Sequence, residues 1–521
     1  MEIRLISRRL AFAFFLVFGA TCLVKEVLRG ADQPTMLAET PPMGWNSWDG
    51  YGTTINEAEF RANADWFATH LKPYGWEYVV VDAEWYVTNP VAEGNSKTFQ
   101  YTMDQFGRYM PPTSRFSSAA NNDGFKPLAD YVHSLGLKFG IHILRGIPKA
   151  AVEKNLPIAG STYYAADAAN TSDTCPWNYD NYGVDAGNPG GQAYYDSIAQ
   201  LYASWGVDFI KVDCISSHPY KGEEIRALST ALSKASHSIV LSLSPGPAPL
   251  EKAEELRKYA QMWRISDDIW DLWHSDKNYP QGIGDQFANA AKWAALSEPG
   301  HWPDGDMLPI GQLRPAPGWG RPRGTRLTHD EQRTLMTLWS MFRSPLMVGG
   351  DLTAGDPWTA SLLTNAEVLA VDQHSTGNRQ VIVTGNAVVW LAQPASRKGY
   401  YLAIFNLADA TETLTFPWRD LGLAGTAYLV RDLWKLKDMG QPIQSQSRYH
   451  HTVACFIGCC VHKWMQCGNT RAITVDNHIH SFQDPHDRRV CHWPIPELRG
   501  HRPGCGTLVL VMLLRRNLLR T

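Results

Sequence analysis

The sequence predicts an α/β protein, a (β/α)8 TIM barrel followed by a small C-terminal antiparallel β-sandwich domain. Between residues 41 and 351, eight strand-like segments alternate with helix-like segments, which is the pattern of a parallel barrel. Several of these segments are nearly continuous apolar runs, as expected for strands buried on both faces. After Val371 the pattern changes to short strands of period two, and this change predicts the second domain.

Each barrel strand is predicted from an apolar run that ends in a loop. The eight segments are Gly44–Trp48, Tyr78–Asp82, Lys138–Ile143, Phe209–Asp213, Ile239–Ser244, Met262–Ser266, His301–Met307 and Pro345–Asp351. Helical patterns fill most of the gaps. Asn56 can cap a helix, and apolar residues recur at helical spacing from Tyr194 to Trp205 before a stop at Gly206. Thr328 opens a further helix in the manner of a capping box.

The second domain is predicted from short strands separated by turn residues. They are Val381–Val383, Ala387–Leu391, Tyr400–Phe405, Glu412–Phe416 and Ala427–Val430. We therefore expect the catalytic barrel to span residues 38–371 and the antiparallel β domain to span residues 372–447.

The N-terminus, residues 1–31, has the pattern of a signal peptide. Arg4, Arg8 and Arg9 precede an apolar run from Leu10 to about Val24, which is short for a membrane span. We expect a secreted or periplasmic protein without stable membrane association after cleavage. An uncleaved segment would instead anchor the chain in the membrane.

The C-terminal stretch, residues 448–521, is atypical. Six of the nine cysteines and eight of the 17 histidines follow Ser447, but their spacing never settles into paired zinc-ligand units. The stretch also lacks strand or helix periodicity. We expect a poorly packed tail without a metal, unless it supplies a closing strand to the β domain.

Composition narrows the function. A net charge of −3 and a pI near 6.6 give no electrostatic reason to expect a nucleic-acid partner. The chain contains 20 tryptophans and 21 tyrosines, and aromatic rings can stack on the C–H faces of sugars. Many of these rings could equally belong to the core.

The candidate catalytic residues are Asp213 and Asp268, each placed where a buried strand runs into a loop. In a parallel barrel these strand ends form the active-site face. Two carboxylates across one sugar ring are the machinery of glycoside hydrolysis. Lys211 lies on the same strand face as Asp213 and could favour its ionised form, although a structural ion pair is an alternative.

Two further acids, Asp82 and Asp306, are expected to face the same barrel mouth. A ring of carboxylates can bind either a metal or sugar hydroxyls. Few histidines accompany these acids, so we expect a glycoside or oligosaccharide substrate and neither a metal nor an organic cofactor.

Four motifs in this order resemble glycoside hydrolase family 27, the α-galactosidases and α-N-acetylgalactosaminidases. They are Pro41–Trp48, Gly136–Ile141, Lys211–Asp213 and Trp302–Met307. The resemblance implies hydrolysis with retention, with Asp213 as nucleophile and Asp268 as acid/base. It also implies sugar contacts from Trp45, Asp82, Lys211, Arg264, Asp306 and Met307.

The sequence departs from the family pattern at three positions. One acid of the usual pair after the second strand is missing or displaced to Glu84, which affects contact with the C6 end of the sugar. His142 replaces a common tyrosine. Ser244 resembles the small residue that N-acetylgalactosaminidases carry near the sugar 2-position, unless another loop fills that space.

The family pattern also implies a disulfide between Cys175 and Cys214. We expect a retaining enzyme that cleaves terminal α-linked galactose. The alternatives are an α-N-acetylgalactosaminidase, a β-L-arabinopyranosidase, and a sugar-binding barrel that has lost catalysis.

Overall fold

The computed structural model describes residues 36–90, 98–313, 321–396, 398–408, 413–414, 418–423, 427–439, 443–444, 473–474 and 508–516. The predicted signal peptide, residues 1–31, lies outside these ranges. None of the described helices is long and apolar enough to cross a membrane.

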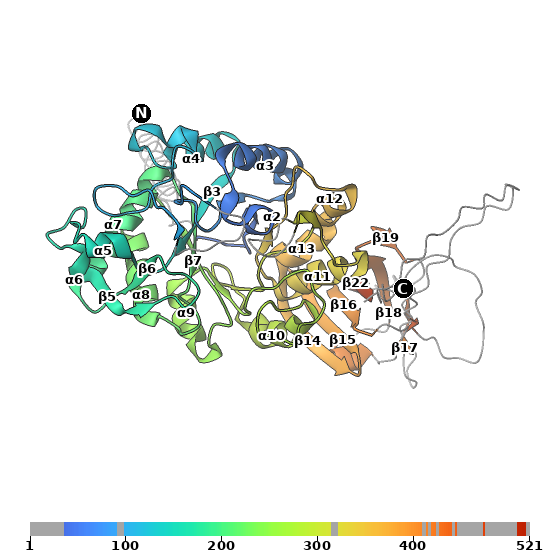
Figure 1. The fold of residues 1–521 in the computed structure, drawn as a ribbon. Coiled ribbons are helices and arrows are strands. Elements are labelled where there is room, and N and C mark those ends of the chain that lie inside the picture. Colours follow the sequence, from blue (N-terminus) through green and yellow to red (C-terminus); the bar gives the residue numbers. More distant parts are fainter. Residues whose placement is uncertain are drawn as a thin grey trace, which may run out of the picture. The chain divides into compact units, whose positions relative to one another are not determined.

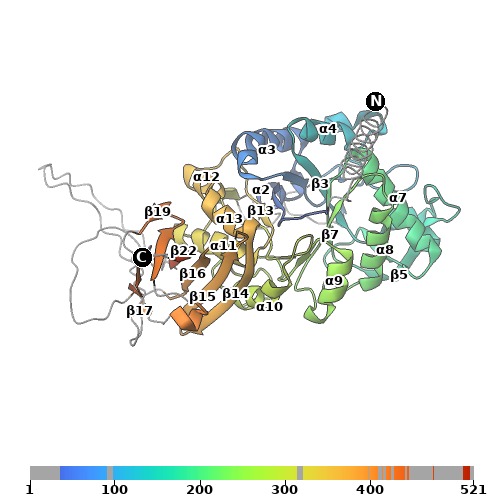
Figure 2. The same cartoon turned by 180° about the vertical axis from the view of Figure 1, so that it is seen from behind.

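An eight-stranded parallel sheet forms the barrel, and it confirms the predicted fold class (Figures 1 and 2). In sheet order its strands are β10 (Trp302–Asp304), β9 (Met262–Arg264), β8 (Val240–Leu243), β7 (Phe209–Asp213), β3 (Lys138–Leu144), β2 (Tyr78–Val81), β1 (Met43–Asn46) and β13 (Leu346–Val348). A parallel bridge between Leu308 and Val348 joins the segment after β10 to β13, so the two edges of the sheet meet.

Helices surround the strands of the barrel (Figure 1). The longer ones are α3 (Glu57–His70), α4 (Lys126–Ser134), α7 (Pro189–Trp205), α8 (Gly222–Ser233), α11 (His329–Phe342) and α13 (Ala366–His374). The shorter ones are α2 (Trp48–Tyr51), α5 (Lys149–Glu153), α6 (Ala165–Ala168), α9 (Ala253–Tyr259), α10 (Phe287–Trp293) and α12 (Pro357–Leu363). A small antiparallel sheet of β4 (Ile147–Pro148), β6 (Asn181–Val184) and β5 (Ala169–Thr174) lies between β3 and α7 in the chain.

The predicted starts of two helices and the predicted end of a third are confirmed by their capping residues. The Asn56 side chain accepts a hydrogen bond from the Glu59 backbone at 3.1 Å, and Glu59 reaches back to the Asn56 backbone at 3.2 Å. Thr328 and Glu331 form the same reciprocal pair at the start of α11. Gly206, with φ at 79°, ends α7 in the left-handed conformation that glycine tolerates.

The C-terminal domain is antiparallel. Its main sheet runs in the order β14 (Ser375–Thr384), β15 (Ala387–Pro394), β16 (Tyr400–Asn406), β22 (Leu508–Arg516), β18 (Ala427–Asp432) and β19 (Lys437–Asp438), and β20 (Ile443–Gln444) also pairs with β18. A separate ladder joins β17 (Thr413–Leu414) to β21 (Ile473–Thr474). One short sheet, β11 (Gln312–Leu313) with β12 (Arg323–Gly324), belongs to the barrel loops.

Strand β22 corrects the expectation that the tail packs poorly from residue 448 onward. Its backbone pairs with β16 on one side and β18 on the other, so it lies inside the sheet (Figure 1). The physical reason is its nearly continuous apolar sequence, which suits a central strand better than a solvent-exposed tail. The alternative that the tail supplies a strand is the correct one. Nearly all other tail residues lie outside the described ranges.

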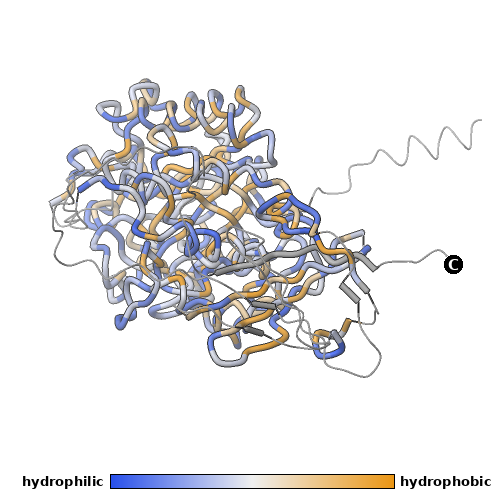
Figure 3. Tube along the Cα trace, turned by 90° about the vertical axis from the view of Figure 1, so that its right-hand side faces the viewer, coloured by the Kyte–Doolittle hydropathy of each residue, from blue (hydrophilic) through white to orange (hydrophobic). Residues whose placement is uncertain are grey.

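The core is rich in large aromatic side chains. Trp45, Trp76, Trp85, Trp263 and Trp302 are all completely or almost completely buried. Hydrophobic segments run through the interior of the described chain, and hydrophilic segments follow its outer loops (Figure 3). Much of the tryptophan content therefore stabilises the barrel instead of binding ligand.

Candidate active site

A cavity of about 750 Å³ opens at the carboxyl ends of the barrel strands. Asp82, Lys211, Asp213, Asp268 and Asp306 all line it. They come from four different strand ends, which only the barrel brings together. The predicted ring of acids is therefore present around one cavity.

Asp213 is the last residue of β7, and its carboxylate is oriented by two donors. Its Oδ1 accepts from the Cys214 backbone at 2.7 Å, and its Oδ2 accepts from Trp177 Nε1 at 3.1 Å. His142 Nε2 lies 3.8 Å from the same Oδ2. Burial lowers the pKa of His142, and the negative charge of Asp82 partly offsets this by raising it.

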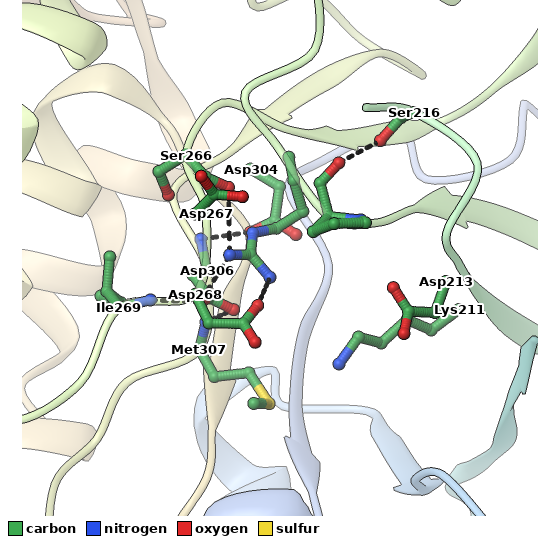
Figure 4. Close-up of polar contacts among 12 residues, drawn as sticks. Lys211, Asp213, Ser216, Ser266, Asp267, Asp268, Ile269, Asp304, Asp306 and Met307 are labelled. Carbon is green, nitrogen blue, oxygen red and sulfur yellow. Dashed lines mark hydrogen bonds and ion pairs between the residues drawn. The ribbon is translucent and has the colours of Figure 1, made fainter. Parts of the chain in front are cut away.

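Asp268 lies in the loop after β9, and its carboxylate faces that of Asp213 across the cavity (Figure 4). Arg264 Nη1 donates to Asp268 Oδ1 at 3.1 Å. The same guanidinium forms an ion pair with Asp306, with 2.7 Å between Nη2 and Oδ2. Burial alone would lower the pKa of Arg264, but Asp306 and Asp268 raise it, so this residue stays charged.

Lys211 pairs with Asp82 in the floor of the cavity, with 3.1 Å between Nζ and Oδ2. We expected Lys211 to favour the ionised form of Asp213. The structure instead shows the alternative interpretation, in which Lys211 forms a structural ion pair, here with Asp82. Asn46 Nδ2 also donates to Asp82 Oδ2, at 2.6 Å. Burial would raise the pKa of Asp82, but Lys211 and His142 lower it to about 2. Asp82 is therefore an ionised acceptor.

Asp306 and Met307 follow β10 and line the cavity. The two Asp306 oxygens accept from the backbone of Met307 and of Ile269, each at 2.8 Å. These bonds hold the carboxylate although its residue has a φ of 91°, which side chains rarely adopt. Burial raises the pKa of Asp306, while Arg264 lowers it.

The structure does not place Trp45, a predicted sugar contact, in the cavity lining. Trp45 is completely buried, and its Nε1 donates to the Gly350 carbonyl at 2.7 Å. Because Trp45 is inside β1, its side chain enters the core. Trp48, just beyond the strand, lines the cavity instead.

Arg264 also differs from the prediction. It lies behind Asp268 and Asp306, lines a small pocket that shares Lys211, Ser244, Asp306 and Met307 with the main cavity, and contacts those two acids. His142, Ser244 and Glu84 do line the main cavity, as predicted.

Glu84 bridges two loops at the side of the cavity. Its Oε1 accepts from Asn178 Nδ2 at 2.8 Å, and its Oε2 has no hydrogen-bond partner among the described residues. Burial, followed by the neighbouring Asp180, raises the pKa of Glu84. Ala83 follows Asp82, where the family resemblance implies a second acid, and it lines the cavity with a methyl group.

The predicted disulfide is confirmed. Cys175 and Cys214 are bonded, with 6.0 Å between their Cα atoms, which is within normal disulfide geometry. The bridge ties the loop after β5 to the residue that follows Asp213.

The cavity lining also includes residues that were not predicted, among them Asp49, Trp177, His218 and Tyr279. Asp49 directly follows the Trp48 motif and is buried; burial and Asp306 raise its pKa. Its position next to the motif was an available signal. The other three lie in irregular loops, where sequence periodicity gives no information about orientation.

The described part of the chain, residues 36–516 with the gaps given above, holds no candidate metal site. There, no three His, Cys, Asp or Glu side chains converge as a metal site requires. All the cysteines and histidines of the tail lie outside the described ranges.

A barrel that presents paired carboxylates in a sugar-sized cavity is the architecture of a glycosidase. Two family models match the chain, alpha galactosidase A over residues 177–374 and the alpha galactosidase C-terminal β-sandwich domain over residues 384–457. The α-galactosidase of Cyamopsis tetragonoloba is 32% identical over 406 residues, covering 77% of this chain and 80% of that protein. The chain belongs to glycoside hydrolase family 27.

Two solved structures are similar along most of their length. A β-L-arabinopyranosidase of the family from Geobacillus stearothermophilus is 48% identical, with a TM-score of 0.74, covering 80% of this chain and 94% of that one. A candidate α-N-acetylgalactosaminidase from Bacillus halodurans is 38% identical, with a TM-score of 0.72, covering 92% of this chain and 98% of that one.

Proposed function

We propose that the protein is a retaining glycosidase that releases terminal α-linked galactose, or the matching pentose β-L-arabinopyranose, by double displacement. The observation that carries the proposal is the pair Asp213 and Asp268, which face one cavity whose floor holds charged hydrogen-bonding groups. Family membership supports the same chemistry.

In the first step Asp213 attacks the anomeric carbon and forms a glycosyl ester. Asp268 gives its proton to the glycosidic oxygen, so the bond to the leaving group breaks and the leaving group departs as an alcohol. Arg264 holds the Asp268 carboxyl in place, at 3.1 Å. In the second step Asp268 takes a proton from water, and the resulting hydroxyl displaces Asp213 from the sugar.

The glycone is bound by groups in the cavity floor. Asp82 and Asp306 are only 2% and 3% exposed, so their oxygens can accept from sugar hydroxyls in a largely water-free environment. The Lys211 ammonium can donate to a hydroxyl beside Asp82. Such charged hydrogen bonds favour one configuration of a sugar ring over another.

The second glycone, β-L-arabinopyranose, is favoured by a specific residue. This sugar is α-D-galactopyranose without the exocyclic hydroxymethyl group. Ala83 cannot form a hydrogen bond with that hydroxyl. A galactoside therefore gains less binding free energy from its hydroxymethyl group here than it would next to a second acid. The 48% identity with an arabinopyranosidase supports this alternative.

An α-N-acetylgalactosaminidase remains a further candidate because Ser244 gives a small side chain to the cavity wall. A non-catalytic sugar-binding role has less support, because both catalytic positions are acids that face the cavity. Export, the proposed location, is compatible with the Cys175–Cys214 disulfide.

The test is a panel of nitrophenyl α-D-galactoside, β-L-arabinopyranoside and α-N-acetylgalactosaminide, with the anomer of the first product followed by NMR. We expect turnover of the first two with retention. Ala83→Asp should shift the kcat/KM ratio toward the galactoside by about tenfold or more, the size of one hydrogen bond to a charged group. If the enzyme turns over only the α-N-acetylgalactosaminide, the proposed glycone is wrong and the glycone is N-acetylgalactosamine.

A second arm tests the nucleophile. Asp213→Ala should abolish turnover, and azide should then give the glycosyl azide of opposite anomeric configuration, because azide enters from the vacated nucleophile face. Near-normal activity of Asp213→Ala would refute the proposed mechanism.

A further inference from the structure

Two aromatic side chains lie side by side at the mouth of the cavity, and neither has been assigned a role. Trp177 and His218 both line the cavity, and Trp177 is 43% exposed. Their ring centroids are 6.1 Å apart, with the ring planes at 84°. Large exposed rings at the rim of a ligand cavity need an explanation other than core packing.

The ring pair connects the two catalytic loops. Trp177 Nε1 donates to Asp213 Oδ2 at 3.1 Å. His218 Nε2 lies 2.7 Å from Oδ1 of Asp267, the residue before the acid/base Asp268. One ring is thus hydrogen-bonded to Asp213 and the other to the neighbour of Asp268, so the pair spans the cavity rim between the two loops that carry these acids.

The backbone that carries Trp177 is held on both sides. Two residues earlier, Cys175 is bonded to Cys214. One residue later, Asn178 is hydrogen-bonded to Glu84 at 2.8 Å. A ring that is exposed but carried on a fixed backbone is preorganised to bind a ligand at little entropic cost.

The cavity has a buried region and an exposed region, and the two differ in the side chains that line them. The charged groups that suit a glycone, Asp82 and Asp306, are almost completely buried. Trp177 and His218 are at the exposed end. A sugar whose anomeric carbon lies between Asp213 and Asp268 would have its anomeric substituent on the Asp268 side, where His218 contacts Asp267 at the exposed end of the cavity.

We propose that Trp177 and His218 form a leaving-group subsite that binds a second sugar ring, and that the Trp177 indole also positions the nucleophile. The inference rests on the proposed glycosidase function and extends it to the other side of the scissile bond. The indole face offers a surface for the C–H face of a pyranose, while its N–H holds Asp213.

The two roles of Trp177 are separated by two substitutions and two substrates. The substrates are the glycosyl fluoride, whose leaving group is too small to reach the rings, and a disaccharide with the same glycone. The glycone is the one on which the wild-type enzyme is active. Trp177→Phe keeps a ring but loses the N–H donor, whereas Trp177→Ala loses both.

Trp177→Phe should lower kcat on both substrates by a similar factor, about ten- to a hundredfold, with KM for the fluoride unchanged. Trp177→Ala should in addition lower kcat/KM for the disaccharide relative to the fluoride by about three- to tenfold. His218→Ala should lower the same ratio without the large loss on the fluoride.

Tyr74→Ala is the matched control, because Tyr74 is similarly exposed, at 41%, and lies outside the cavity lining. It should leave both rates unchanged. If the wild type hydrolyses both substrates but the disaccharide-to-fluoride ratio is the same in Trp177→Ala and His218→Ala, the subsite is refuted while the glycosidase proposal stands. Absence of wild-type turnover on every glycone would refute both.

Discussion

At the scale of single residues, one buried guanidinium organises the acid side of the site. Arg264 contacts both Asp268 and Asp306 and is itself only 1% exposed. Removing one partner of such a buried charge cluster leaves an unpaired charge, which is costly. Arg264 therefore holds the Asp268 and Asp306 carboxylates in place, although it does not line the main cavity.

The proposed role of Asp268 as general acid leads to a prediction at the scale of single residues. Asp268→Ala should lower kcat/KM for sugar or methyl leaving groups by about 10²- to 10⁴-fold, the usual contribution of general acid catalysis. Leaving groups that need no proton, such as dinitrophenol, should react at nearly the wild-type rate in the first step. The measurement is kcat/KM against leaving-group acidity.

Asp196→Asn is a suitable control for that series. Asp196 lies on α7 outside the cavity lining, paired with the exposed Lys234. Its substitution should leave the dependence on leaving group as in the wild type. An equal loss on all leaving groups in Asp268→Ala would instead assign this residue a positioning role.

The presence of two acids at one cavity could be predicted from the sequence because an acid at the end of an apolar strand has few structural explanations. Asp213 and Asp268 stand out in this way. The choice between Trp45 and Trp48 could not be made, since the motif does not show where β1 ends. Trp177 and His218 were missed because irregular loops have no period from which a side-chain direction can be inferred.

At the scale of elements, β22 shows how a distant segment completes a sheet. The strand pairs with Tyr400–Asn406 and with residues 428–432, more than 70 residues away in sequence. An apolar run alone does not specify a sheet partner, so its position could not be derived from the sequence. In the sheet it covers two strand edges that would otherwise be open to aggregation.

Truncation after residue 447 should therefore destabilise the β domain. Without β22, strands β16 and β18 lose their common neighbour. We expect a lower Tm and more aggregation, measured by thermal unfolding and light scattering. Val511→Pro should also lower the Tm and increase aggregation, because proline removes a backbone donor in the middle of a central strand.

Catalysis should survive that truncation wherever the barrel remains folded, since all the cavity residues precede residue 308. The kcat/KM of the remaining soluble enzyme should match the full chain. An unchanged Tm in both variants would mean that β22 contributes nothing to stability.

The disulfide supports a second element-scale prediction. It joins residues 39 positions apart, and a closed loop of that length stabilises the folded state by up to about 4 kcal/mol. Cys175→Ser should lower the free energy of unfolding by up to that amount, measured by urea denaturation. It should also reduce kcat, because the loop that carries Trp177 is released on one side.

Reductant provides the control for this variant. It should destabilise the wild type to the level of Cys175→Ser and have no further effect on the variant. A wild-type protein whose stability is insensitive to complete reduction would contradict the prediction.

At the scale of the whole molecule, burial of acids sets the pH dependence of stability. Burial raises the pKa of several carboxyl groups distributed over the barrel, namely Asp49, Glu84, Asp180, Glu224, Asp304 and Asp372. Of these acids only Asp49 and Glu84 line the cavity, and burial of the whole set lowers the stability of the ionised folded state.

The sign of the effect follows from proton linkage. Above the unfolded-state pKa of about 4, groups with a raised pKa bind more protons in the folded state, so stability increases as the pH falls toward that value. Asp82 acts in the opposite direction. Its pKa of about 2 stabilises the folded protein above about pH 4, and this contribution is lost as the pH falls toward 2.

We therefore predict that the free energy of unfolding is greatest near about pH 5 and declines on both sides. Urea denaturation across the range from about pH 3 to 8 measures it. Asp372 offers the matched variant, because it is completely buried on α13 outside the cavity, with Oδ1 lacking a hydrogen-bond partner among the described residues. Asp372→Asn should reduce the decline above pH 5 and leave kcat unchanged. Stability that rises steadily from pH 5 to 8 would show that the buried acids do not control it.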